Sequence, residues 1–245
     1  MSVNGRRGLV LGIPVDVAGL GEFADWIDER GRCYVPGDSA EYLATVNLDF
    51  LATLPEREWT CGLAEMFKHG CLEQSGRVLE ELLANAGSLR DPTSPALARA
   101  ILDSAGVKAE VVSRDEREGG LRAILNLGHT TAHALESLTG YKRFSHGEAV
   151  ARGLATALLL SQRLAGLAGP ELERLLEAMA TMGLPRDTAG ASLEDVWEHM
   201  KFDKKSEQGA PRFVLLRAPG DPVYGQPVEL ADFAAVWNEQ RERFG

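Results

Sequence analysis

The chain has 245 residues, of which 44% are hydrophobic and 25% charged, a composition typical of a globular protein with a sizeable core in one or two domains. Its formal net charge of −10 argues against a general nucleic-acid-binding or membrane-surface protein, because both kinds of partner are anionic. A small anionic substrate stays compatible with this charge, since a local cluster of Lys and Arg can outweigh the global sign. The three cysteines form no CxxC pair and no apolar stretch reaches transmembrane length. We therefore predict a cytoplasmic protein with reduced thiols and without a signal peptide.

The first fifty residues have a short α/β pattern. Residues 8–18 (GLVLGIPVDVA) predict a buried strand, and residues 19–31 (GLGEFADWIDERG) predict a helix. Gly19, Gly21 and Ala24 formally fit the G-x-G-x-x-A pattern of a dinucleotide site. Because no acidic residue ends a second strand, we interpret this triplet as a turn.

From about residue 48 onward the pattern is mainly that of helices. Apolar residues recur at helical spacing in six segments: residues 47–73 (with Pro55 able to begin the helix), 75–89, 94–116, 147–168, 169–185 and 192–205. Residues 212–220 (RFVLLRAPG) are the one convincing late strand, and residues 229–244 predict a closing helix. The expected fold is mainly α, a multi-helix body over residues 51–245 behind a short α/β head over residues 1–50.

Histidines mark the candidate site. His129 and His133 are four residues apart, so they share one face of a helix, as pairs of zinc ligands often do. A catalytic zinc site commonly takes two histidines and a carboxylate and leaves one position open. Glu65, among small and apolar neighbours, and His146, at the start of the long apolar helix, are the other candidates. The residues alone support a site of Glu65, His129 and His146 with His133 as the next candidate, although each of them singly is by default an ordinary helix residue.

Several separated motifs together resemble one family. They are LDFLATLPEREWTCGLAEMFKHG, LRAILNLGHTTAHALESLTGY, SHGEAVARGLATA, MKFDKK and RFVLL, in this order. They closely resemble 3-dehydroquinate synthase, a sugar phosphate cyclase of the shikimate pathway, from about residue 46 to the C-terminus. LNLGHT together with HGEAV favours this branch over the sister cyclases that make inosose or valiolone precursors.

The resemblance implies a function for individual residues. It implies one Zn²⁺ or Co²⁺ held by Glu65, His129 and His146. The implied catalytic residues are His133, Lys68 and Asn126, and the implied substrate-binding residues are Lys108, Arg122 and one of Lys204 and Lys205. The family's substrate is a seven-carbon sugar acid phosphate, whose carboxylate and phosphate suit Arg and Lys. Asn126, His129 and His133 step by three and four, so one helical face could present all three together, unless Gly128 marks the start of the helix.

The resemblance also implies NAD, which the family uses together with the metal to eliminate phosphate and cyclise the substrate. Phe50, Leu51, Ala52 and Thr53 match the end of the family's NAD-contacting set. The family's earlier nucleotide-binding motifs, GGG-x-x-GD, SSVGGKT and GKN, do not occur in this sequence. Residues 1–50 are therefore interpreted as a remnant or replacement of the nucleotide-binding domain, and NAD binding is expected to be weak or absent, since the pyrophosphate cradle is missing.

Two alternatives to an active synthase stay open on this sequence. One is a non-enzymatic metal-binding domain, and the other is a sister sugar phosphate cyclase with a different substrate. The partner we expect is the small-molecule substrate, with no nucleic acid and no membrane, and a homodimer is compatible with the resemblance.

Overall fold

The computed structural model describes residues 48–115, 120–201 and 210–245, together with four two-residue strands nearer the N-terminus. Those strands are β1 (Ser2–Val3), β2 (Arg6–Arg7), β3 (Trp26–Ile27) and β4 (Cys33–Tyr34), paired antiparallel as β1–β2 and β3–β4. Trp26–Ile27 lies inside the helix expected at residues 19–31 and is a strand instead, as suits an aromatic and a β-branched residue with a partner strand. The rest of that segment, the glycine triplet and the strand expected at residues 8–18 lie outside the described residues.

From residue 48 the described chain is helical except for one hairpin. In order, the elements are η2 (Leu48–Thr53), α1 (Glu56–Leu72), α2 (Arg77–Asn85), η3 (Ala86–Ser88), α3 (Pro95–Arg114), η4 (Leu121–Asn126), α4 (His129–Leu138), α5 (His146–Leu160), the π-helical turn η5 (Ser161–Ala165), α6 (Gly169–Thr181), α7 (Leu193–Lys201), β5 (Arg212–Ala218), β6 (Asp221–Pro227) and α8 (Leu230–Phe244). The expectation of a mainly α fold is confirmed. None of the helices described is long and apolar enough to cross a bilayer.

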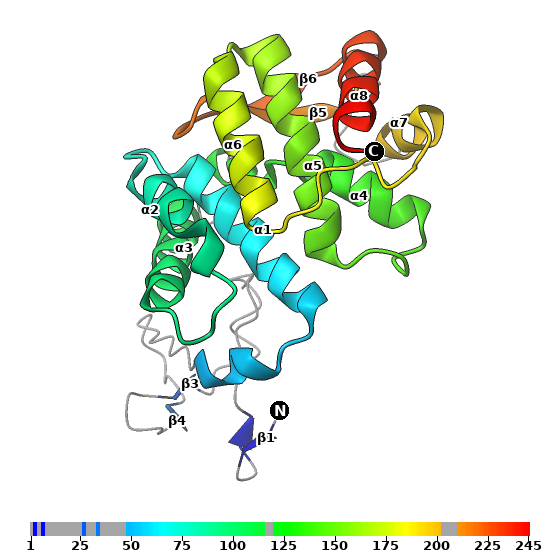
Figure 1. Ribbon diagram of the computed structural model, residues 1–245. Helices are drawn as coiled ribbons and strands as arrows, with labels where there is room; N and C mark the ends of the chain where they lie inside the picture. Colours follow the sequence, from blue (N-terminus) through cyan, green and yellow to red (C-terminus); the bar gives the residue numbers. More distant parts are fainter. Residues whose placement is uncertain are drawn as a thin grey trace.

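Helix α5 runs through the middle of the molecule, with α1, α4 and α8 packed around it (Figure 1). Its residues are apolar or small on almost every side, and Val150, Leu154 and Leu158 are all buried. A helix that is hydrophobic all round has to be enclosed by other elements, so the sequence itself places α5 in the core. Helices α2 and α3 pack against the other side of α1.

Two glycines of α5 allow neighbouring backbones to come unusually close. A Cβ added at Gly153 would lie 2.0 Å from the carbonyl oxygen of Gly128, and one added at Gly147 would lie 2.1 Å from Cα of Cys61. Any larger side chain at either position would push the elements apart. As a result, the N-terminal ends of α4 and α5 lie directly beside the middle of α1.

The segment before α4 decides between the two alternatives for Asn126. Asn126 ends the 3-10 helix η4, and Gly128, with φ of 81°, then breaks the chain direction before His129 begins α4. The left-handed conformation at Gly128 separates the two elements, so Asn126 does not share a continuous helical face with His129 and His133. Of the two alternatives that the sequence left open, the structure has Gly128 at the start of the helix.

The C-terminal third contains two more differences. The helix expected over residues 147–168 ends at Leu160 and passes into the turn η5, where Ser161 Oγ donates to Ala157 O and accepts from Leu216 N of β5. Sequence analysis also missed strand β6, which pairs antiparallel with β5 although it contains Pro222. A proline is tolerated there because β6 is an edge strand of a two-stranded sheet.

The close approach at Gly153 makes a testable prediction about stability. Gly153→Ala should lower the free energy of unfolding by about 1–3 kcal/mol, because the new methyl group meets backbone atoms that cannot move aside. Gly106→Ala is the matched control, since Gly106 lies inside α3 with open space around its Cβ and should be neutral or slightly stabilising. Urea unfolding measures both, and a Gly153→Ala protein as stable as Gly106→Ala would contradict this packing.

Candidate metal centre

Three helices each supply one side chain to a single point. Glu65 lies in the middle of α1, while His129 and His146 are the first residues of α4 and α5. Glu65 Oε1 lies 3.8 Å from His129 Nε2 and 3.9 Å from His146 Nε2, and one ligand atom from each residue lies within 4.8 Å of the others. Two donors bound to one zinc ion at about 2.1 Å each are at most about 4.2 Å apart. Both glutamate–histidine pairs are therefore already within the range for sharing an ion.

The Glu65 carboxylate is the buried charge of this site. Its side chain is 2% exposed, and its Oε2 forms an ion pair with Lys68 Nζ at 2.6 Å. The other oxygen, Oε1, is buried without any hydrogen-bond partner. Burial acts to raise the pKa of the carboxyl, but the charge of Lys68 outweighs it and holds the pKa below its usual value. An ionised oxygen in such surroundings is costly unless a donor or a cation satisfies it, so this donor set fits a divalent metal.

Hydrogen bonds on the far side of each imidazole leave the Nε2 atoms available. His129 Nδ1 lies 3.1 Å from the Leu127 carbonyl oxygen, and His146 Nδ1 lies 3.1 Å from Glu136 Oε1. A carbonyl or an ionised carboxylate only accepts, so both Nδ1 atoms carry the proton and both Nε2 lone pairs face Glu65. Burial and then Lys68 hold the pKa of His129 well below its usual value, which keeps that ring neutral. The hydrogen bond to Glu136 raises the pKa of His146, so a metal there competes with a proton.

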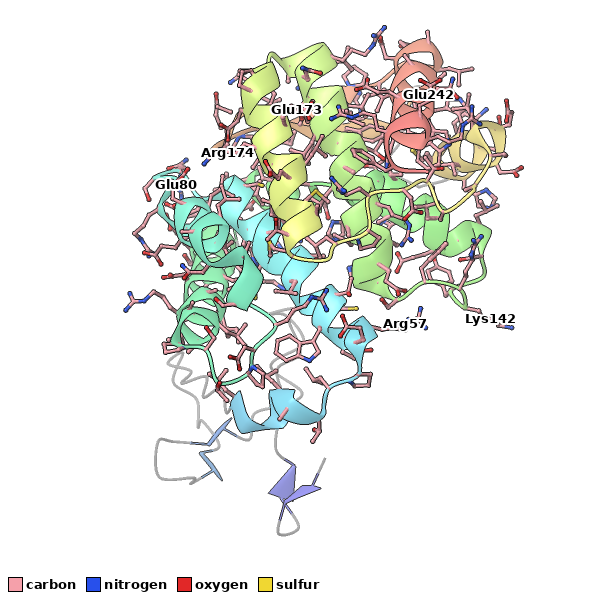
Figure 2. All side chains as sticks on the ribbon, viewed as in Figure 1. Arg57, Glu80, Lys142, Glu173, Arg174 and Glu242 are labelled. Carbon is pink, nitrogen blue, oxygen red and sulfur yellow. The ribbon has the colours of Figure 1, made fainter. Side chains whose placement is uncertain are left out.

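The start of α5, which carries His146, is fixed by a capping box. Ser145 Oγ accepts from the Glu148 N–H, and the Ser145 N–H donates to Glu148 Oε2 at 2.7 Å. Arg57, near the start of α1, donates to the same Glu148 oxygen at 2.7 Å and to the Arg143 carbonyl at 3.0 Å. Figure 2 shows Arg57 beside the loop between α4 and α5 that carries Lys142. These contacts hold the N-terminus of α5 against α1.

His133 lies one turn along α4 from this point and is exposed. Its ring is edge-on to that of His129, with the centroids 5.6 Å apart, and it is not one of the three residues whose donor atoms converge. Asn126, His129 and His133 line a pocket of about 190 Å³ together with Arg212 and Tyr224 of the β5–β6 hairpin. The structure therefore brings Glu65, His129 and His146 together and leaves His133 on the wall of the adjoining pocket.

The predicted cationic residues differ in burial and in their distance from the candidate ligands. Lys68 is buried in the ion pair with Glu65. Lys108, half-buried on α3, is near enough for its charge to lower the pKa of His69. Arg122 lies half-buried in η4, where its backbone N–H donates to Asp115 Oδ2 at 2.8 Å. Lys204 and Lys205 lie outside the described residues.

The four residues expected to contact NAD belong to η2, just before α1. Leu51 is buried in the hydrophobic core, whereas Ala52 and Thr53 are exposed. The backbone of Phe50 lies in the same 3-10 helix, and its side chain is outside the described part of the chain.

Sequence analysis missed two groups that border the metal ligands. His69 is buried, with Nδ1 at 2.7 Å from Ser104 Oγ and with Nε2 unpartnered at 4.0 Å from Glu65 Oε2. Burial and then Lys68 lower its pKa to about 3, so the ring is neutral. Glu136 is the partner of His146. Helical spacing was the available signal, because His69 follows Glu65 by four residues and Glu136 follows His129 by seven.

Comparison with known proteins shows which family the chain resembles in sequence. A sequence model described as the 3-dehydroquinate synthase C-terminal domain matches residues 62–206. The 3-dehydroquinate synthase of Leptospira interrogans is 45% identical over 194 residues, which are 79% of this chain and 53% of the relative. The chain belongs to the 3-dehydroquinate synthase family. Another family member, from Halorhodospira halophila, is also 45% identical over 194 residues, 79% of this chain and 54% of its own length. The chain thus spans about half the length of the curated family members it matches.

Solved structures extend the likeness to the fold. The 2-epi-5-epi-valiolone synthase of Streptomyces hygroscopicus, with NAD⁺ and Zn²⁺ bound, superposes with a TM-score of 0.73 at 23% identity, over 86% of this chain and 58% of that one. A 2-deoxy-scyllo-inosose synthase complexed with carbaglucose-6-phosphate, NAD⁺ and Co²⁺ gives 0.69 at 21% identity, over 85% and 58%. These two synthases therefore share the helical fold of this chain.

The ligand assignment predicts the effect of removing one imidazole. His146→Ala should lose bound zinc while keeping its helical circular dichroism, because the side chain is part-exposed and contributes little to the core. His199→Ala is the control, since His199 lines a second pocket together with His146 but its Nδ1 is bonded to Asp195 O on its own helix. Metal content after dialysis measures both variants. Equal zinc in His146→Ala and His199→Ala would show that the ligand assignment is wrong.

Proposed function

We propose that this chain provides the metal- and substrate-binding part of a 3-dehydroquinate synthase, which eliminates phosphate from a seven-carbon sugar acid phosphate and cyclises the product with the help of NAD. The observation that carries the proposal is the buried, unpartnered Glu65 Oε1 between the Nε2 atoms of His129 and His146. Supporting it, curated relatives carry the name 3-dehydroquinate synthase.

In this proposal Glu65, His129 and His146 hold Zn²⁺ or Co²⁺. When bound, the ion supplies Lewis-acid polarisation of a substrate oxygen. Lys68 holds Glu65 ionised through their 2.6 Å ion pair, so the carboxylate keeps its charge despite its burial. His133, exposed on the pocket wall next to His129, takes and returns a proton of the substrate.

The substrate's two anionic groups require separate cationic partners. Asn126 borders the pocket and is placed to donate to a substrate oxygen. Arg122, in the same 3-10 helix, and Lys108 on α3 supply positive charge, with Lys204 and Lys205 completing the set. A chain of net charge −10 gains affinity for a substrate with both a carboxylate and a phosphate only through such a local concentration of cations.

The chain has few residues that match the family's NAD-binding residues. Residues 50–53 match only the end of the family's NAD-contacting set, and the phosphate-binding motifs of that set do not occur in the sequence. Orientation of a nicotinamide against the substrate carbon is worth several kcal/mol of barrier. We therefore propose that NAD binds weakly to this chain alone, which keeps a non-enzymatic metal-binding domain as the second candidate function.

Three measurements on the zinc-loaded chain separate these candidates, with His146→Ala as the metal-free control. We expect about one zinc per chain, weak quenching in an NADH fluorescence titration, and slow phosphate release from the seven-carbon acid but not from glucose 6-phosphate. Bound zinc without any NADH signal or phosphate release would leave only the non-enzymatic metal-binding function. Phosphate release from glucose 6-phosphate would instead identify a sister cyclase.

A further inference from the structure

Glu136 is a buried carboxylate that neither the metal triad nor the substrate residues include. It lies two residues before the end of α4 and is 7% exposed. Its Oε1 lies 3.1 Å from Nδ1 of His146, the first residue of α5. The N-terminal end of a helix carries a partial positive charge, which adds to the attraction for this carboxylate.

His146 needs such a partner more than the other two ligands do. Its side chain is 38% exposed, against 12% for His129 and 2% for Glu65. It borders a pocket of about 500 Å³, in which Glu136, His133 and Ser137 are also wall residues. An imidazole beside open space can turn away from Glu65, whereas the His129 ring is enclosed and is bonded to the Leu127 carbonyl.

The backbone around Glu136 is itself fixed. The Tyr141 N–H donates to the Glu136 carbonyl at 2.8 Å, closing the turn that follows α4, and Thr139 Oγ1 donates to the same oxygen. The carboxylate therefore projects from a part of the chain that is held by its own hydrogen bonds. A partner anchored in this way restricts the ring it binds.

We propose that Glu136 is the positioning residue for His146: it holds the proton on Nδ1 and turns the ring so that Nε2 faces Glu65. Carboxylates that accept from the second nitrogen of a ligating imidazole fix both its tautomer and its orientation, and they increase its basicity as a ligand. This inference rests on the proposed metal site and assigns to Glu136 a role in metal affinity that is independent of NAD and substrate.

Zinc affinity, measured on the full chain by competition with a chromogenic chelator, tests the proposal with two variants. Glu136→Met keeps the volume of the side chain and removes the acceptor, so we expect about 10–100-fold weaker zinc binding. Glu136→Gln keeps an oxygen that accepts from Nδ1–H, so its affinity should stay within a few-fold of wild type. Ser137→Ala, at an exposed position on the same pocket wall, should bind zinc as wild type does.

The absorption spectrum of the Co²⁺-loaded proteins gives a second readout, which should change for Glu136→Met and not for Ser137→Ala. A Glu136→Met protein with wild-type zinc affinity would overturn the proposal while leaving the metal site in place. Equal losses in the Met and Gln variants would also overturn it, because they would reflect loss of the charge or of local structure and not loss of the acceptor. A wild-type chain that binds no zinc would contradict the metal site itself.

Discussion

The candidate site depends on one buried oxygen atom, Oε1 of Glu65. Glu65 Oε1 lies in the middle of the packed helices with no donor to satisfy it, while its companion oxygen is paired with Lys68. Leaving a charged oxygen unpaired in the interior costs several kcal/mol, and proteins keep such groups where a cation or a substrate completes them. The helices α1, α4 and α5 leave this oxygen without a hydrogen-bond donor. They bring the Nε2 atoms of two imidazoles to within 3.8 and 3.9 Å of it.

The Nδ1 protons of the two histidines point away from Glu65, which also favours a cation beside it. Each of the two histidines donates a hydrogen bond from Nδ1 to an acceptor outside the triad. The acceptor of His129 is the Leu127 carbonyl, and that of His146 is the Glu136 carboxylate. Both Nε2 lone pairs therefore face Glu65, and metal binding requires loss of a proton only when His146 is charged. Lys68 has a double effect, because it stabilises the charge of Glu65 and also keeps His129 neutral. In the proposed site, a cation would bind without large movement of Glu65, His129 and His146.

The sequence predicted most of the helices and the set of Glu65, His129 and His146, whose donor atoms the structure brings together, but it did not predict strand β6. The apolar periodicity of α1, α5 and α6 is strong, so their existence followed from the sequence alone. Strand β6 was missed because Pro222 and Gly225 mask its pattern, and its pairing with β5 is a tertiary contact. Asn126 lies on a different element from the two histidines because Gly128 takes a left-handed conformation and marks the start of α4, an alternative that the sequence had left open. Glu65 and His129 are 64 residues apart in the sequence, so no local pattern predicts their convergence. The residue types made the three side chains candidates, and the family resemblance implied them as one ligand set.

The proposed metal site and the proposed binding of NAD can be tested separately on this chain. The three donor residues, their hydrogen-bond partners and the residues that line the adjoining pockets all lie within the described part of the chain, and none of them depends on NAD. The most direct test of the account is zinc K-edge X-ray absorption on the chain loaded with one equivalent of zinc. The account predicts two imidazole nitrogens and a carboxylate oxygen around the ion, with no sulfur. A sulfur ligand, which would point to the nearby Cys61, or a first shell with a third imidazole from His133 would contradict it.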